Sequence, residues 1–129
     1  MAGDPVGVGF DLSDAPRLAT SLARRPGLAA RLFTEAERGR LTEAARQGDP
    51  VPAAQHFAAK EAVMKSLRVG VDSVAFTDIE VDPALAGVSL SGRAARRATE
   101  LGVRTWALEV GVRPGPEGPV ATAEVLAIG

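Results

Sequence analysis

The chain has 129 residues, 46% of them hydrophobic and 24% charged, and its 15 basic and 16 acidic side chains give a net charge of −1. This length predicts a single compact domain over residues 1–129. The near-neutral charge argues against nucleic-acid binding through a broadly basic surface. The absence of cysteine excludes disulfides and thiol nucleophiles, and the single histidine, His56, excludes a two-histidine metal site within one chain.

The sequence also predicts the compartment. No apolar run approaches the ~20 residues that a membrane span requires, and the N-terminus lacks a charged segment followed by an apolar one. We therefore expect a cytoplasmic protein with no membrane and no nucleic-acid partner.

The first half of the chain predicts one strand followed by helices. Apolar side chains alternate with two glycines and an acid over residues 5–12, the period of a strand. Ser13 or Asp14 is a suitable N-cap for a helix to about residue 25. A capping-box pattern, Thr34 with Glu37, starts a helix that runs to about residue 47. Residues 53–68 are rich in helix-forming side chains and predict the longest helix.

The second half predicts strands with one more helix. Strands are expected over 75–81, 88–90, 103–112 and 120–128, and a helix over 92–101 that ends at Gly102. The segment RPGPEGP, residues 113–119, predicts a turn that joins the last two strands as a hairpin. This order of elements predicts an α+β fold whose sheet is mostly antiparallel and packs against the long helix.

The helix over 53–68 has apolar side chains around much of its circumference. Glu61, Lys65 and Arg68 form a narrow charged stripe between apolar flanks, whereas a surface helix usually has one broad polar face. Glu61 is therefore expected to be partly buried, and a buried carboxylate needs a cation, a hydrogen-bond donor or a metal. The alternative is a pair within the helix, between Glu61 and Lys65 at i,i+4.

Asp11 ends a strand whose other residues on the same face are glycines. A carboxylate there is a candidate ligand for a hard cation such as magnesium, and the alternative is a helix N-cap or a solvated strand end. The segment GVGFDL lacks the third glycine of a dinucleotide-binding loop, so that interpretation is rejected. His56 is either a packed residue or a catalyst. The basic first helical region, with Arg17 and Arg24, is either a solvated face or a docking surface for an acidic partner.

Four segments together resemble one known family: GVGFDLSDAPRL, RLFTEAER, HFAAKEAVMKSL and FTDIEV. The similarity as a whole runs from about residue 6 to residue 101 with few interruptions. The chain resembles the holo-acyl-carrier-protein synthase family, the small trimeric branch of the 4′-phosphopantetheinyl transferases. The resemblance implies transfer of 4′-phosphopantetheine from coenzyme A to a serine of an acyl carrier protein, as in fatty acid or polyketide biosynthesis. It also implies a homotrimer with the active site between neighbouring subunits, so that Asp11 and Glu61 need not lie close within one subunit.

The resemblance assigns roles to individual residues. It implies that Asp11 and Glu61 hold magnesium, and that Lys65 joins them as a catalytic residue by contacting phosphate. The implied coenzyme A contacts are Lys60, Lys65, Gly70 and His56, where His56 replaces the family's usual arginine. The implied carrier-protein contacts are Arg17 and Arg24.

The C-terminal third departs from the family pattern. The family's Ser-His pair falls on Gly111 and Val112, Glu109 replaces a small polar residue, Glu124 enters an apolar strand position, and the hairpin at 113–119 is longer. Two hypotheses follow. The chain is a working transferase in which His56 or water takes over the missing function, or it is a repurposed relative that acts as a carrier-protein-binding trimer or in another reaction.

Overall fold

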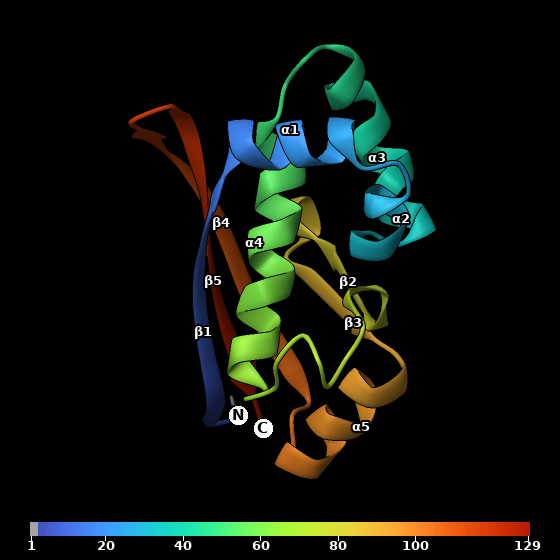
Figure 1. Ribbon diagram of the computed structural model, residues 1–129. Helices are drawn as coiled ribbons and strands as arrows, with labels where there is room; N and C mark the ends of the chain where they lie inside the picture. Colours follow the sequence, from blue (N-terminus) through green and yellow to red (C-terminus); the bar gives the residue numbers. More distant parts are fainter. Residues whose placement is uncertain (1–2) are drawn as a thin grey trace.

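The computed structural model describes residues 3–129 and places an antiparallel three-stranded sheet beside a long central helix (Figure 1). The sheet consists of β1 (Pro5–Asp14), β4 (Thr105–Gly115) and β5 (Gly118–Ile128) in the order β1-β5-β4. The predicted α+β class and antiparallel pairing are confirmed. Since β5 lies between β1 and β4, the first and last segments of the chain are neighbours in the sheet.

Helix α4 (Val51–Ser66) packs directly on β1 and β5. The two glycines of β1 make this close contact possible. A Cβ atom on Gly7 would lie 2.0 Å from the carbonyl oxygen of Ser66, and one on Gly9 would lie 1.9 Å from that of Ala62. Both distances are far inside van der Waals contact, so the strand approaches the helix backbone only because side chains are absent there. Asp11 follows at the next position on the same face of β1.

Three helices cover the end of the molecule at which α4 begins (Figure 1): α1 (Ala15–Arg24), α2 (Leu28–Leu32) and α3 (Glu35–Arg46). Asp14 caps α1 by accepting a 3.0 Å hydrogen bond from the backbone N–H of Arg17. The capping box predicted at Thr34 and Glu37 is present. The sequence reading missed α2, because a five-residue helix between Gly27 and Phe33 is too short to show a period.

A second, two-stranded sheet lies on another side of α4 and contains β2 (Ile79–Asp82) and β3 (Gly87–Leu90). Single 3₁₀ turns, η1 (Phe76–Asp78) and η2 (Pro83–Leu85), precede each strand. The predicted strand from residue 75 was therefore wrong for its first half, where Asp78 accepts from the backbone N–H of Ala75 and closes a turn. Helix α5 (Gly92–Leu101) ends at Gly102, whose φ of 78° suits a left-handed C-terminal glycine.

The predicted turn over 113–119 was also wrong in extent. Strand β4 continues to Gly115 and β5 begins at Gly118, so only Pro116 and Glu117 form the turn. Proline in a sheet is tolerated where its missing N–H faces no partner strand. Pro114 and Pro119 lie opposite each other beside the turn, and no third strand pairs there, because β4 is an edge strand and the pairing of β5 with β1 stops at Val120.

The two faces of the larger sheet differ sharply. The face toward α4 is apolar and buried, with Ala123 and Val125 at its centre. On the opposite face three side chains of β1 stay exposed, namely Val8 at 69%, Phe10 at 50% and Leu12 at 55%. An apolar row this exposed on a sheet face is typical of a surface that meets another protein.

Candidate functional site

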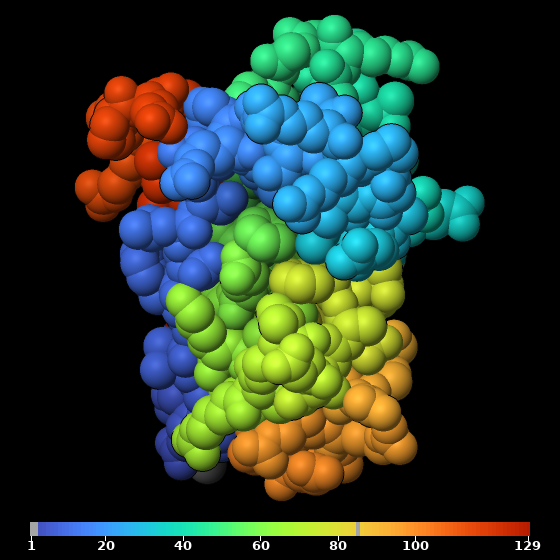
Figure 2. Space-filling view, in the orientation of Figure 1, coloured from blue at the N-terminus to red at the C-terminus, as the bar shows by residue number. Residues whose placement is uncertain are grey.

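The candidate site lies where Asp11 meets the exposed edge of α4. Strand β1 continues beyond Asp11 to Asp14, so this residue does not end the strand as the sequence predicted. Lys65 on α4 donates a 2.7 Å hydrogen bond to Asp11 Oδ1 and a 3.0 Å bond to the carbonyl oxygen of Phe10. The Asp11 side chain is 13% exposed and that of Lys65 is 56% exposed. Figure 2 shows that only a narrow strip of α4 reaches this surface, between β1 and α1 on one side and the segment after α4 on the other. Lys65 is therefore open to solvent, whereas Asp11 is mostly covered.

Glu61 is the second carboxyl group at this position. Burial, the negative charge of Asp11 and a hydrogen bond between the two side chains raise the pKa of Glu61 to about 7, although Lys65 opposes this. Within residues 3–129, Asp11 Oδ2 is buried and has no hydrogen-bond donor. When Glu61 is protonated, its carboxyl O–H can donate to Asp11. The two carboxyl groups therefore favour sharing one proton over both being ionised. The hydrogen bond from Lys65 to Asp11 raises the pKa of Lys65.

These contacts bear on two questions that the sequence left open. Asp11 and Glu61 lie together within one chain, so no subunit boundary is needed to unite them. The ion pair of Lys65 is formed with Asp11, 54 positions away, and not with Glu61 on the same helix. The structure brings together three residues that the sequence singled out, Asp11, Glu61 and Lys65, but the sequence did not predict how they pair. Their roles stay predictions.

Lys60 lies elsewhere, although it was expected to contact coenzyme A beside Lys65. Its side chain is fully buried and its Nζ lies 2.5 Å from Oε1 of Glu37, which is also fully buried. Successive residues of a helix point about 100° apart, so Lys60 faces α3 while Glu61 faces β1. A buried, paired ammonium is not available to a phosphate, and the expected coenzyme A contact is therefore wrong for this structure. Glu37 was missed as a buried partner.

His56 is also turned away from the site. It is 7% exposed, and its Nδ1 lies 2.8 Å from the carbonyl oxygen of Pro52. The charged groups that act on it are Glu37, Arg40 and Lys60, and burial is the largest effect that lowers its pKa. A histidine packed in this way does not replace a catalytic group beside Asp11, which corrects the expectation that His56 takes over the missing function.

The remaining predicted residues are exposed or lie outside the cluster. Gly70 lies in the exposed loop after α4, and a Cβ there would meet nothing within 4 Å. Arg17 and Arg24 are exposed on α1. Gly111 and Val112 pair with β5, and the Gly111 carbonyl oxygen accepts a 3.3 Å hydrogen bond from Gln55.

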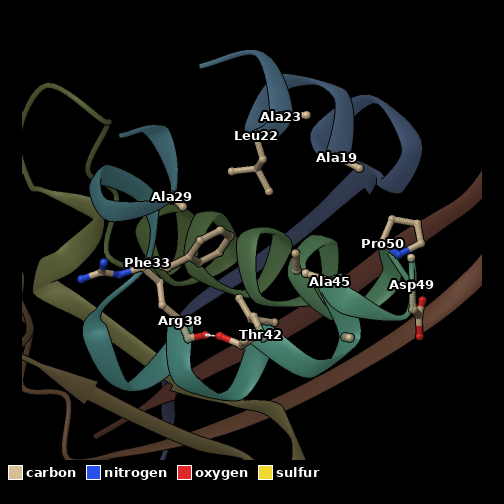
Figure 3. A pocket seen from close by; sticks show the side chains of 14 residues that line it. Ala19, Leu22, Ala23, Ala29, Phe33, Arg38, Thr42, Ala45, Asp49 and Pro50 are labelled. Atoms are coloured by element: carbon tan, nitrogen blue, oxygen red, sulfur yellow. Dashed lines mark hydrogen bonds between the residues drawn. The ribbon is translucent and has the colours of Figure 1, made fainter. Parts of the chain in front are cut away.

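A separate cavity of about 560 Å³ lies between α1, α2, α3 and the start of α4 (Figure 3). Leu22, Phe33 and several alanines make its lining mostly apolar, and Arg38 and Asp49 lie at its margin. None of the predicted site residues lines it, so the cavity is distinct from the Asp11–Glu61 cluster.

No helix within residues 3–129 is long and apolar enough to cross a membrane. The same residues contain no group of three or more potential metal ligands from His, Cys, Asp and Glu side chains. Asp11 and Glu61 therefore form a two-carboxylate cluster, which differs from the closed ligand sets of structural metal sites.

The fold and this cluster define an α+β protein with a polar site at a strand–helix contact, and comparison with known proteins identifies its family. The family model "4'-phosphopantetheinyl transferase superfamily" matches residues 7–113, and the chain belongs to that superfamily. The resemblance seen in the sequence is thereby confirmed.

Individual relatives agree with this assignment. The chain is 40% identical over 122 residues to the holo-[acyl-carrier-protein] synthase of Streptomyces avermitilis, covering 92% of this chain and 97% of the relative. Among solved structures, the Plasmodium yoelii acyl carrier protein synthase with ADP bound superposes with a TM-score of 0.83 at 23% identity, covering 100% and 98% of the two chains. The Chronobacterium ammoniagenes ACPS–CoA complex gives 0.67 at 24% identity, covering 95% and 97%. These two structures show the shared fold.

Proposed function

We propose that this chain transfers 4′-phosphopantetheine from coenzyme A to a serine hydroxyl of an acyl carrier protein. The observation that carries the proposal is the Asp11–Glu61–Lys65 cluster, which presents two carboxyls and an ammonium at one open surface. Membership of the superfamily, the names of the curated relatives and the coenzyme A complex of a structural neighbour support it. In this reaction the serine oxygen forms a bond to the β-phosphorus of coenzyme A. The bond to 3′,5′-adenosine bisphosphate then breaks.

The cluster fits a magnesium ion. Asp11 Oδ2 is buried without a donor, and the neighbouring Glu61 has its pKa raised by burial and by the charge of Asp11. A divalent cation relieves both problems, and magnesium favours sites with one or two carboxylates completed by phosphate oxygens and water. Asp11 and Glu61 are thus the residues that would hold it. When bound, magnesium would neutralise charge on the pyrophosphate of coenzyme A.

Lys65 supplies the positive charge of the site. Its side chain is more than half exposed and the pKa of its ammonium group is raised, so it stays protonated at neutral pH. The hydrogen bonds to Asp11 and Phe10 hold it beside the strand while leaving it accessible to a phosphate. Charge neutralisation and positioning are the main contributions that a protein makes to phosphoryl transfer. We therefore infer that Lys65 contacts the phosphate. A water molecule or a carboxylate of the cluster accepts the proton of the serine hydroxyl.

The carrier protein is proposed to dock on α1. Arg17 and Arg24 are both exposed on this helix, which follows directly from β1 and therefore from Asp11. A basic helix beside the site suits an acidic partner, because complementary charge increases the rate and selectivity of docking. Arg17 and Arg24 stand two helical turns apart on one side of α1.

A homotrimer is proposed to form through the exposed face of the larger sheet. Val8, Phe10 and Leu12 on β1 and Leu126 on β5 leave apolar surface in contact with solvent on that face. Glu124 lies opposite Phe10 on one side and Glu109 on the other, so two carboxylates share the centre of this surface. A trimer would cover the apolar residues, and its mass in solution is measurable by sedimentation.

Binding of coenzyme A tests the proposal without a carrier protein. A ligand at about 100 times its dissociation constant adds about 2.7 kcal/mol to the free energy of unfolding. We expect coenzyme A with magnesium to raise the melting temperature of the chain clearly, and expect Asp11→Asn to remove the increase. The repurposed-relative hypothesis predicts no shift, so an unchanged melting temperature would contradict the transferase proposal.

A further inference from the structure

Helix α4 is buried on most of its circumference. Its buried positions are Ala54, His56, Ala58, Ala59, Lys60, Ala62, Val63, Met64 and Ser66. Because successive residues point about 100° apart, the consecutive buried residues cover nearly every direction around the axis. A helix with a single apolar stripe is oriented by burial of that stripe. Apolar burial alone does not fix the rotation of α4 about its own axis.

Close packing on β1 constrains the rotation only in part. The contact at Gly9 is made by the backbone carbonyl of Ala62, and the contact at Gly7 by that of Ser66. The Cα atoms of Ala62 and Ser66 also lie within 3.4 Å of these Cβ positions, so the packing sets how near α4 lies to β1 and turns these two residues toward the strand. It does not by itself fix the direction of Glu61.

The Glu37–Lys60 pair provides the missing constraint. Glu37 is held from two elements, because its Oε1 accepts a 2.8 Å hydrogen bond from the backbone N–H of Thr34 and its Oε2 accepts a 2.8 Å bond from that of Val81. Lys60 Nζ completes the set at 2.5 Å and lies 5.7 Å from the centre of the Phe33 ring. The side chains of both members are fully buried. In this interior, the ammonium group of Lys60 is paired in one orientation of α4 about its axis, the one in which Lys60 faces Glu37.

We propose that Lys60 and Glu37 are positioning residues that set the rotation of α4 and thereby place Glu61 beside Asp11. Glu61 is the next residue of the helix, so the direction of Lys60 determines the direction of Glu61. Rotating α4 about its axis by one residue, or about 100°, would separate Lys60 from Glu37 and leave two buried charges without partners. Such unpaired buried charges are strongly unfavourable. A single buried polar group fixes register in coiled coils in the same way. The role in catalysis rests on the proposed function, but the placement itself does not.

The absence of cysteine offers a test that needs neither metal nor coenzyme A. The D11C/E61C variant places two thiols at the cluster, and a bifunctional methanethiosulfonate reagent bridges them within one chain. Intact mass spectrometry measures the bridged fraction over time. The same pair of cysteines is then introduced with E37Q/K60M, which removes the ion pair but keeps side-chain volume and an acceptor for a backbone N–H at position 37.

The matched control is Val63→Ala on the same helix, where a fully buried side chain is shortened without touching the pair. It lowers the melting temperature through a cavity. We expect bridging to be at least tenfold slower with E37Q/K60M than without it, and nearly unchanged with Val63→Ala. Equal bridging rates in the E37Q/K60M and parent backgrounds would overturn the proposal. Slowing by Val63→Ala to the same degree would also overturn it, since general loosening of α4 would then explain the effect.

If E37Q/K60M does not fold, Glu37→Asp replaces it, because this change keeps both charges and moves the carboxyl group. Bridging should then be slowed severalfold, and an unchanged rate again contradicts the positioning role. A second readout is Mn²⁺ affinity of the chain with Asp11 and Glu61 intact, measured by titration calorimetry. It should fall at least tenfold in E37Q/K60M and stay within twofold in Val63→Ala. Failure of the parent chain to bind Mn²⁺ would count against the proposed function, and the bridging rates would still decide the positioning role.

Discussion

Lys65 pairs with Asp11 across the contact between α4 and β1, with 2.7 Å between Nζ and Oδ1, although Glu61 lies only one turn away on the same helix. Among the residues that the structure describes, Glu61 forms no ion pair of its own beside this second carboxylate, and its pKa rises to about 7. The cluster therefore disfavours two negative charges, which a shared proton relieves and a bound cation would relieve as well. Structural ion pairs remove such repulsion, whereas sites for metals and phosphates retain it.

Metal-free protein should be stabilised by Glu61→Gln above neutral pH. A carboxyl whose pKa is raised in the folded state contributes stability below its unfolded pKa, and this contribution is lost as pH rises through the folded value. For Glu61 the loss falls between pH 4.5 and about 7. After allowance for solvent screening, we expect the free energy of unfolding at pH 8 to be ~1–2 kcal/mol higher in Glu61→Gln than in the parent chain. The melting temperature of the variant should then be ~3–6 °C higher. At pH 4 the difference should vanish, and a constant difference at both pH values would contradict the account.

His56 should make the protein sensitive to acid. Burial lowers its pKa below the usual 6.5, so on acidification the unfolded chain takes up a proton before the folded chain does. Stability is then lost as pH falls below 6.5, by about 1.4 kcal/mol for each pH unit over which only the unfolded chain is protonated. Urea unfolding at pH 7.5 and 5.5 measures the loss. His56→Gln should reduce it, and an identical loss in both proteins would show that His56 is not responsible.

The glycine contact between β1 and α4 should not tolerate a side chain. Gly9→Ala brings a Cβ to 1.9 Å from the carbonyl oxygen of Ala62, and moving two backbones apart is expected to cost about 3 kcal/mol. Gly70→Ala is the matched control, because nothing lies within 4 Å of its Cβ. We expect it to change the free energy of unfolding by less than about 0.5 kcal/mol. Similar losses in both variants would mean that the close approach is not required.

Reversing charge on α1 should impair use of the carrier protein and leave the chemistry intact. For R17E/R24E we expect the KM for an acidic carrier protein to rise at least tenfold, with kcat changed less than threefold. Arg93 and Arg96 are equally exposed on α5 and provide the control pair R93E/R96E. An equal rise in KM for the control would show that net charge matters, and not docking on α1.

The carboxylates themselves are expected to be essential for turnover. Asp11→Asn and Glu61→Gln should each lower kcat/KM by about 10²–10⁴, the range seen when a group that stabilises charge is removed. Lys65→Ala should act on the same scale. Circular dichroism spectra should match that of the parent chain. Retention of most activity in Glu61→Gln would remove this residue from the site.

The sequence predicted the elements with clear periodicity and the cluster residues with unusual surroundings. Asp11 stood out because glycines precede it on its strand face, and Glu61 because apolar residues flank it. Both signals are local, and the structure explains them by the glycine contact between β1 and α4. The trimer, the bound magnesium and the residue roles stay predictions, since they involve partners beyond one chain.

What the sequence did not predict depends on contacts between distant segments. Lys60 and Lys65 look equivalent along the helix, yet Lys60 is buried against Glu37 and Lys65 is exposed beside Asp11. Glu37 was recognised only as part of a capping box, because that pattern says nothing about what lies beyond the helix end. The prolines of the last hairpin suggested a long turn, but β4 and β5 accommodate them where no further strand needs their N–H groups.

Intact mass spectrometry of an apo carrier protein incubated with this chain, coenzyme A and magnesium tests the central claim most directly. The account predicts that the carrier protein gains the mass of one phosphopantetheine group, that 3′,5′-adenosine bisphosphate appears in equal amount, and that Glu61→Gln suppresses both. A panel of several acidic carrier proteins guards against a narrow preference. No gain on any carrier at stoichiometric enzyme, or the same gain with Glu61→Gln, would contradict it.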